Sequence, residues 1–229
     1  MSIADNIKSL KKETEADKVI LLAVSKTKPA AEVQEAYDAG QRLFGENQVQ
    51  ELVEKQEQLP KDIEWHLIGH LQTNKVKYIA PFVSMIQSVD SVKLLQEINK
   101  LAQKAVRVID CLLQIYIADE ETKFWLGFDE AIELLRSDEF AACKNIRIRG
   151  LMGIATNTDN EKQIKDEYYE LKTFFDGIKV SYFRKDDSFN ILSMGMSSDY
   201  KIAIEQGSNM VRLGSTIFGT RVVKHWKNN

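Results

Sequence analysis

Apolar and polar residues follow two alternating patterns along this chain. Continuous apolar runs of strand length, such as residues 19–25, are typical of strands covered on both faces in a parallel sheet. Between these runs lie mixed segments whose apolar residues recur at helical spacing. The clearest of them has one apolar face, formed by Leu94, Leu95, Ile98, Leu101 and Ala105. The alternation predicts a chain in which each strand is followed by a helix.

The pattern predicts eight strands. They span residues 19–25, 42–45, 64–68, 82–88, 106–117, 146–154, 191–194 and 210–213. Helices are expected at residues 30–39, after Asn47 as N-cap, near 73–80, after Asp90 or Ser91, at 128–137, at 160–176 and at 199–206. Gly40 and Gly177 are expected to end the helices that precede them.

Eight strand-then-helix units define the expected fold class. They predict an α/β protein with a closed parallel (β/α)8 barrel, or TIM barrel, over about residues 18–221. Residues 1–16 are polar with a few apolar positions, which predicts an extra N-terminal helix outside the barrel. Because no internal repeat or Pro/Gly-rich linker interrupts residues 1–229, we expect a single domain.

Composition narrows the class of protein. The chain has 229 residues, of which 44% are hydrophobic and 28% charged, enough for the core of one barrel. Its net charge is −3 and its lysines are scattered, so the sequence lacks the basic patch that is typical of nucleic-acid binding. No apolar run reaches the length of a membrane span. The N-terminus lacks the basic and apolar regions of a signal peptide. We therefore expect a cytoplasmic protein with neither nucleic-acid nor membrane partners.

The cysteines and histidines predict no metal site. Cys111 and Cys143 have no metal-motif spacing and are expected to be buried, reduced thiols. His66 and His70 straddle a predicted strand end rather than sharing one helix face, so structural roles are favoured over zinc binding. His225 belongs to a basic tail that we expect to be solvated.

Lys26 is the first candidate for chemistry. It stands at the carboxyl end of the first predicted strand, and Pro29 stops that segment shortly afterwards. In a TIM barrel the functional site lies at the carboxyl ends of the strands. A partly desolvated lysine amine at such a position has a lowered pKa and can form a Schiff base. A solvated loop lysine is the alternative, and for a lysine considered alone it is the commoner case.

Two loops are candidates for binding an oxyanion. Ser197 and Ser198 follow the seventh strand, and Gly214 and Ser215 follow the eighth, where TIM barrels often hold phosphate. For each loop taken alone, a simple helix cap or a turn is the commoner explanation. Because strand eight neighbours strand one in a closed barrel, both loops and the lysine are expected at one mouth. Arg212, at the end of strand eight, would face a ring nitrogen or a phosphate, or form a surface ion pair.

Six motifs together resemble the pyridoxal phosphate homeostasis proteins, in the same order and over about residues 7–221. The motifs are residues 23–29, 44–51, 66–75, 149–152, 192–199 and 211–219. The resemblance implies a barrel like the N-terminal domain of bacterial alanine racemase, with pyridoxal 5′-phosphate (PLP) carried as a lysine aldimine. The chain departs from the family pattern at residues 123–127 and 180–190. Both segments lie outside these motifs, so they affect the expected shape of loops and of any partner surface, and not cofactor binding.

The resemblance also implies roles for individual residues. Lys26 matches the Schiff-base lysine, and Arg212 matches the arginine that faces the pyridine nitrogen. Ser197, Ser198, Gly214 and Ser215 match the phosphate-binding loops, and Asn47 matches a residue that lines the pocket. The complete set of cofactor-binding candidates is Lys26, Asn47, Met194, Ser197, Ser198, Arg212, Gly214 and Ser215. No catalytic residue and no metal ligand is predicted.

Two functions fit this resemblance: a carrier that maintains intracellular PLP, and a racemase-like amino-acid enzyme. An arginine at the pyridine nitrogen keeps that nitrogen unprotonated, which weakens the ring as an electron sink. The racemases that resemble this barrel take a second base from an added C-terminal domain of the partner subunit, and this chain ends ten residues after Gly219. We therefore predict a monomeric carrier without robust turnover, whose partners are PLP and PLP-dependent apo-enzymes. A lysine aldolase on the same fold is a third alternative.

Overall fold

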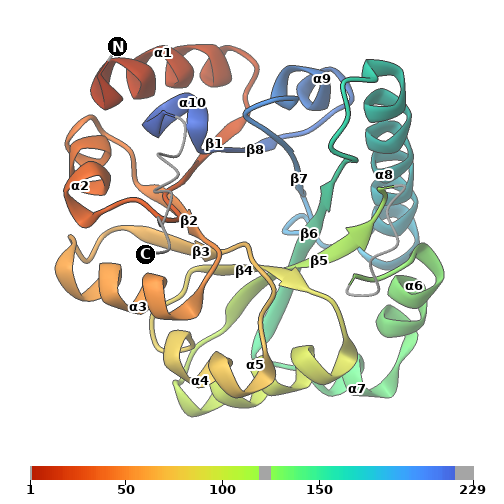
Figure 1. The fold of residues 1–229 in the computed structure, drawn as a ribbon. Coiled ribbons are helices and arrows are strands. Elements are labelled where there is room, and N and C mark those ends of the chain that lie inside the picture. The colour runs from red at the N-terminus through yellow and green to blue at the C-terminus, as the bar shows by residue number, and fades with distance from the viewer. Residues whose placement is uncertain (1, 119–124, 220–229) are drawn as a thin grey trace, which may run out of the picture.

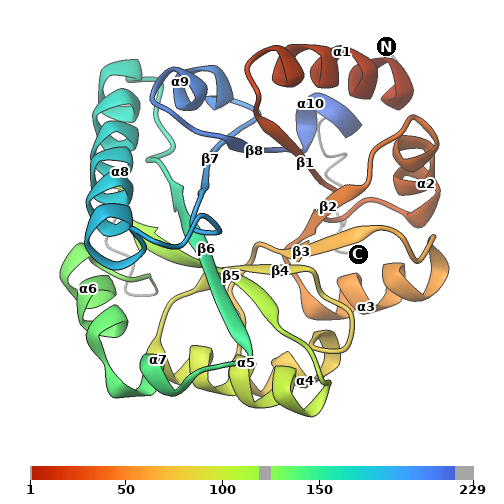
Figure 2. The same cartoon turned by 180° about the vertical axis from the view of Figure 1, so that it is seen from behind.

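Eight parallel strands close into a barrel in which β1 pairs with both β2 and β8 (Figure 1). The computed structural model describes residues 2–118 and 125–219. Helices alternate with the strands and surround the barrel, as the view from behind also shows (Figure 2). The predicted α/β class and the TIM barrel are confirmed. The segment from Lys123 to Phe124 and the tail with His225 lie outside the described residues.

The barrel strands lie close to their predicted positions. They are β1 (Ile20–Val24), β2 (Leu43–Glu46), β3 (Glu64–Leu67), β4 (Met85–Val89), β5 (Ile109–Tyr116), β6 (Ile146–Ile154), β7 (Ile191–Met196) and β8 (Met210–Leu213). The helices are α1 (Ile3–Ala16), α2 (Ala30–Asp38), α3 (Val49–Gln58), α4 (Val76–Ile79), α5 (Val92–Lys104), α6 (Phe128–Arg136), α7 (Asp138–Ala142), α8 (Glu161–Tyr182), α9 (Tyr200–Glu205) and α10 (Ser215–Phe218), with a 3-10 turn at Thr73–Lys75.

The N-terminal helix α1 is held against the last helix of the barrel. Its first turn is fixed by a capping box between Ser2 and Asp5. The Asn6 side-chain amide donates to the Ile217 carbonyl of α10 at 2.9 Å, and Ile7 is fully buried. Helix α1 therefore lies beside α10 and α2 (Figures 1 and 2) and supports the segment that follows β8.

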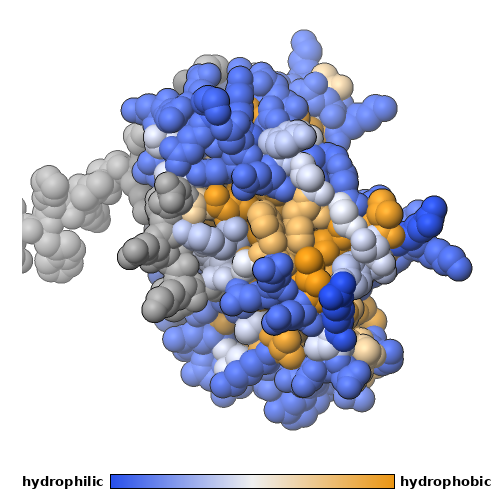
Figure 3. All heavy atoms as spheres, turned by 90° about the vertical axis from the view of Figure 1, so that its right-hand side faces the viewer, coloured by the Kyte–Doolittle hydropathy of each residue, from blue (hydrophilic) through white to orange (hydrophobic). Residues whose placement is uncertain are grey.

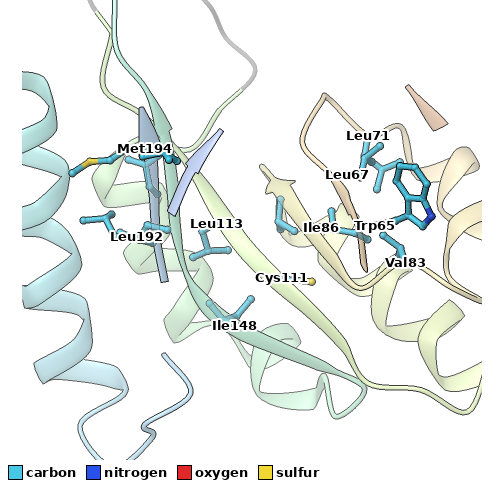
Figure 4. Close-up of a cluster of buried hydrophobic side chains, with 14 of the residues drawn as sticks. Trp65, Leu67, Leu71, Val83, Ile86, Cys111, Leu113, Ile148, Leu192 and Met194 are labelled. Atoms are coloured by element: carbon cyan, nitrogen blue, oxygen red, sulfur yellow. The ribbon is translucent and has the colours of Figure 1, made fainter. Parts of the chain in front are cut away.

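The core has two apolar layers that follow the alternation of side chains along each strand. The larger layer lies between the strands and the helices, and Figure 4 shows part of it, with Trp65, Leu113 and Met194. The smaller layer is a separate cluster whose members come from five consecutive strands, β4 to β8, and lie inside the barrel. It consists of Met85, Leu112, Met152, Ile191 and Met210.

The structure corrects several predicted boundaries. Strand β5 begins at Ile109 instead of residue 106, because Val106 has a φ of 55° in the turn after α5 and is 90% exposed. Helix α8 continues past Gly177 to Tyr182, since the buried Ile178 anchors the next turn to the core. The N-cap of α3 is Gln48 rather than Asn47.

The outer surface is mostly hydrophilic. Figure 3 shows the side of the molecule that carries α6 and α8, where hydrophilic residues surround a central apolar area. The half-buried rings of Phe128 on α6 and Phe174 on α8 contact each other with centroids 4.6 Å apart. Within residues 2–118 and 125–219, no helix combines the length and apolar character needed to cross a membrane.

Candidate functional site

A cavity of about 340 Å³ lies at the carboxyl ends of the barrel strands. Its wall includes residues that follow β1, β2, β7 and β8, so the closure of the barrel brings together segments far apart in the chain. Among the predicted site residues, its lining contains Lys26, Asn47, Ser197, Ser198, Arg212, Gly214 and Ser215. Apolar lining comes from Val24, Ile68, Ile154 and Met196. The volume falls in the range of about 300–1,000 Å³ that is usual for small-molecule sites.

Met194 does not reach this cavity, contrary to the prediction. Its side chain is fully buried in the layer between β7 and the helices (Figure 4), and its carbonyl accepts a hydrogen bond from the Ser208 hydroxyl at 2.7 Å. Strand alternation explains the difference, because Ser193 points into the barrel and Met194 therefore points out. Gly195, with a φ of 97°, then bends the chain, and Met196 lines the cavity instead.

Lys26 stands in a tight turn directly after β1. The amide of Lys28 donates to the carbonyl of Ser25 at 3.0 Å, which makes residues 25–28 a β-turn with Lys26 at its first central position. Lys26 is half-buried and lines the cavity. Lys28 also lines it, with its ammonium donating to the Phe218 carbonyl at 2.9 Å and lying 3.5 Å from the Glu32 carboxylate.

The loops after β7 and β8 meet at the same cavity, and β8 pairs with β1, which carries the Lys26 turn. The hydroxyl oxygen of Ser197 accepts hydrogen bonds from the amides of Gly214 and Thr216, at 3.2 and 3.3 Å. These amides belong to the start of α10, a four-residue helix that the sequence did not predict. Ser197 and Ser198 do not open a helix themselves, because α9 begins at Tyr200. Hydroxyl and amide N–H groups thus converge here, which is the donor set that oxyanions bind.

Arg212 is a buried cation at the cavity, not part of a surface ion pair. Its side chain is only 3% exposed, with Nη1 donating to the Ser193 hydroxyl at 2.8 Å and Nη2 to the Gly153 carbonyl at 2.9 Å. Burial lowers the pKa of Arg212, while Tyr168 and Asp199 nearby favour its charged form. A guanidinium retains its proton even so, because its pKa starts above 12.

A chain of hydrogen bonds leads from Arg212 into the barrel. The Ser193 hydroxyl donates to Gln87 Oε1 at 2.7 Å, and Gln87 Nε2 lies 2.9 Å from His66 Nδ1. Burial lowers the pKa of His66 to about 4, so its ring is neutral. His66 Nδ1 then accepts a hydrogen bond from the Gln87 side-chain amide. Sequence patterns did not identify Ser193 or Gln87 as members of this chain.

The second predicted histidine lies elsewhere. His70 is exposed, and its Nδ1 is 3.1 Å from a carboxylate oxygen of Asp90. His66 and His70 therefore share no site, and no cluster of metal-ligating side chains occurs within the described residues. Cys111 is buried, and burial raises the pKa of its thiol; Cys143 is half-buried, and both thiols are reduced.

Comparisons with known proteins agree on one family. The family model for the alanine racemase N-terminal domain matches residues 1–222. The pyridoxal phosphate homeostasis protein of Pasteurella multocida is 38% identical over 208 residues, which cover 89% of this chain and 87% of that protein. The chain belongs to the pyridoxal phosphate homeostasis protein family.

Solved structures of this family superpose closely on the barrel. PipY from Synechococcus elongatus without PLP has a TM-score of 0.88 and 34% identity, over 95% of this chain and all of that one. PipY with PLP bound has a TM-score of 0.84 at the same identity and coverage. The structure of one family member with the same fold has therefore been solved with PLP bound.

The cavity of the present chain has the donor groups that PLP requires. A phosphate needs hydroxyl and amide donors, and Ser197 and Ser215 line the cavity beside the loop amides. Arg212 gives the lining a buried cation. An aldehyde needs a primary amine, which Lys26 provides. A Cβ at Gly214 would approach the Val24 carbonyl oxygen to 3.2 Å, so the glycine lets the loop after β8 pack closely against β1. The residues present thus fit PLP.

Proposed function

We propose that this chain binds PLP in the cavity at the carboxyl end of the barrel and carries it, without robust turnover, to maintain the intracellular PLP supply. The observation that carries the proposal is the pairing of two features in one cavity. Lys26 offers an amine at this cavity, and the Ser197, Ser198 and Ser215 hydroxyls line it beside the loop amides. The PLP-bound structure of PipY supports this assignment.

The polar loops and the apolar lining of the cavity have different tasks. The loops after β7 and β8 bind the phosphate, since charge-assisted hydrogen bonds from hydroxyls and amides are the strong ones for an anion. The apolar lining, with Ile154 and Met196 among it, suits the flat ring, and Asn47 adds a polar side chain to the wall. When bound, PLP supplies an aldehyde that condenses with a primary amine and releases water.

Arg212 supports a carrier over an enzyme. A guanidinium is a donor only, so beside a ring nitrogen it leaves that nitrogen without a proton and weakens electron withdrawal. Amino-acid racemisation also needs two bases on opposite faces of the substrate. The described wall of the cavity has no Tyr, His, Cys or carboxylate side chain to serve as the second base, and its second lysine, Lys28, is paired with the Phe218 carbonyl and the Glu32 carboxylate.

Borohydride reduction of the PLP-loaded protein, followed by peptide mapping, tests the binding site. The pyridoxyl adduct is expected on Lys26. An adduct on Lys28, which also lines the cavity, or on Lys75 would contradict the assignment.

Deuterium exchange at Cα of a panel of L- and D-amino acids tests the carrier role. We expect exchange no faster than with free PLP. Exchange on the order of 1 s⁻¹ or faster would favour the racemase-like alternative. A protein that remains colourless with PLP would favour the aldolase alternative.

We further propose that the chain acts as a single-domain monomer in the cytoplasm and passes PLP to PLP-dependent apo-enzymes. Reactivation of an apo-enzyme by the PLP-loaded protein tests delivery, and size-exclusion chromatography with light scattering tests the monomer. Transfer no faster than from free PLP would argue against delivery.

A further inference from the structure

The turn that carries Lys26 contains a strained residue. Thr27 has a φ of 65°, in the left-handed region, at the second central position of the turn. A turn with positive φ at this position favours Gly or Asn, and a β-branched residue is a clear outlier there. Such backbone strain persists only where surrounding contacts over-determine it. Thr27 is exposed, so apolar packing of its own side chain does not hold it.

A buried cluster of charged side chains holds this turn from below. Lys55 of α3 is 5% exposed, and its ammonium donates to the Ser25 carbonyl, to Glu46 Oε1 and to Glu51 Oε1, each at 2.7 Å. These contacts match the three protons of an ammonium group. One contact is thus made directly to the residue that precedes Lys26.

The two carboxylates extend the contact to both sides of Lys26. Glu46 Oε1 also accepts a hydrogen bond from the Ser25 hydroxyl at 2.6 Å. Glu51 Oε1 also accepts one from the Thr27 amide at 2.6 Å. The residues immediately before and after Lys26 are therefore bound to the same charged cluster, which comes from β2 and α3.

This cluster is a poor way to gain stability alone. Glu46 is fully buried, and its second oxygen, Oε2, has no hydrogen-bond partner within the described residues. Burial raises the pKa of Glu46 to about 7, although Lys55 favours the charged form. Replacing a buried ion pair by apolar residues of similar volume is often neutral or stabilising. A role in local geometry accounts for the cluster better than a role in overall stability.

We propose that Lys55, Glu46 and Glu51 are positioning residues that hold the strained turn at Thr27, so that the Lys26 amine is presented to the cavity. The inference rests on the proposed function, because it assigns the cluster to the lysine that binds PLP. In the assisted step the Lys26 nitrogen bonds to the aldehyde carbon of PLP, and the aldehyde oxygen leaves as water. The cluster contributes by setting the position of the amine before this step.

The test removes both charges of the buried pair and then relieves the strain. In the Glu46→Gln/Lys55→Met variant, the new side-chain amide still accepts from Ser25, and no lone buried charge is left. Visible absorbance after mixing with PLP gives the incorporation rate, which we expect to fall on the order of tenfold.

Adding Thr27→Gly, which removes the φ penalty, is expected to restore at least about a third of the parent rate. The matched control is Lys162→Met, which removes an exposed (i, i+4) pair with Asp166 on α8 and should leave the rate unchanged.

Rescue separates positioning from general support of the fold. The melting temperature of the PLP-free double variant should not recover when Thr27→Gly is added, even though the incorporation rate does. A double variant that incorporates PLP at the parent rate would overturn the inference. A loss that Thr27→Gly does not relieve would also overturn it, because the cluster would then only support the fold.

A second measurement needs neither PLP nor the double variant. Glu51→Gln keeps the buried Glu46–Lys55 pair and weakens the acceptor that the Thr27 amide shares with the Lys55 ammonium. In the PLP-free protein, hydrogen–deuterium exchange of that amide should become on the order of tenfold faster. Unchanged exchange would overturn the inference. If the parent protein gives no adduct on Lys26 while this exchange responds as expected, the proposed function fails and the role of the cluster in the turn stands.

Discussion

The two ends of the barrel use their charged residues differently. At the amino-terminal end, Asp110 accepts from Arg147 Nε at 2.7 Å and from Arg149 Nη1 at 2.6 Å, so that two cations share one carboxylate. At the carboxyl end, Lys26 and Arg212 line a cavity whose described wall has no Asp or Glu. Positive charges gathered along one wall create a potential that attracts an anion. The comparison indicates that the amino end serves stability, whereas the carboxyl end is built for an anionic ligand.

The barrel interior continues this division. The apolar cluster with Met152 and Met210 fills another part of the interior, and none of its five members lines the cavity. The chain from Arg212 through Ser193 and Gln87 to His66 joins the two parts. Substitutions in the cluster should therefore change the free energy of unfolding, and substitutions at the cavity should change PLP binding.

The largest effect is expected from Lys26→Ala. This variant removes the amine and should abolish the borohydride-stable adduct completely, while hydroxyl and amide donors of the phosphate side remain. PLP should then bind only reversibly, and the melting temperature of the PLP-free protein should stay close to that of the parent. Mass spectrometry after reduction and equilibrium dialysis measure the two kinds of binding. An undiminished adduct would show that another lysine carries PLP.

Met152→Ala tests the interior apolar cluster, which we compare with the cavity. Met152 is fully buried within the interior cluster, so truncation should lower the free energy of unfolding by about 2–5 kcal/mol. PLP affinity of the folded variant should change less than about threefold, because Met152 does not line the cavity. Urea denaturation and a PLP titration supply both values. A large loss of affinity in a stable variant would break the division between the two parts.

The pH dependence of stability tests His66, the last member of the hydrogen-bonded series that joins the cavity to the interior cluster. The pKa of His66 is about 4 in the folded protein, below its ordinary value of 6.5. Between these two pH values the unfolded chain binds a proton that the folded protein does not. The contribution of His66 is therefore complete above pH 6.5 and is lost as pH falls toward 4, by roughly 3 kcal/mol in all.

Urea denaturation between pH 4 and pH 7 measures this contribution. The raised pKa of Glu46 acts with the opposite sign in the same range, because there the folded protein binds the extra proton. The His66 share is therefore the difference in slope between the parent and His66→Gln. Parallel slopes for the two proteins would show that His66 does not stay neutral in the folded state.

Sequence patterns predicted the barrel well because eight apolar runs with helical segments between them leave few arrangements. They also predicted which segments meet at the cavity, since a closed barrel places strand eight beside strand one. They missed the chain from Arg212 to His66, because it joins side chains from β8, β7, β4 and β3 that share no local motif. Strand alternation places Ser193 inside the barrel and Met194 outside it, whereas the motif around Met194 predicted a residue of the cavity.

The strained turn was also invisible in the sequence. Positive φ is usually marked by Gly or Asn, and here the position is occupied by Thr27. Helix α10 escaped prediction for a related reason, because four residues give no helical period. What the sequence could not reveal in both cases is geometry that tertiary contacts impose against local preference.

The smallest expected effect concerns the phosphate side of the cavity. Ser197→Ala with Ser198→Ala removes two hydroxyls from this wall, and one of them accepts from the amides of Gly214 and Thr216. Charge-assisted hydrogen bonds contribute roughly 1.5–3 kcal/mol each, but the loop amides remain as donors, so PLP affinity should fall by about ten- to thirtyfold. Pyridoxal without its phosphate is the matched control, because its already weaker binding should be nearly unaffected by the double substitution. If PLP and pyridoxal lose affinity equally, the serines support the loop and the phosphate is bound elsewhere.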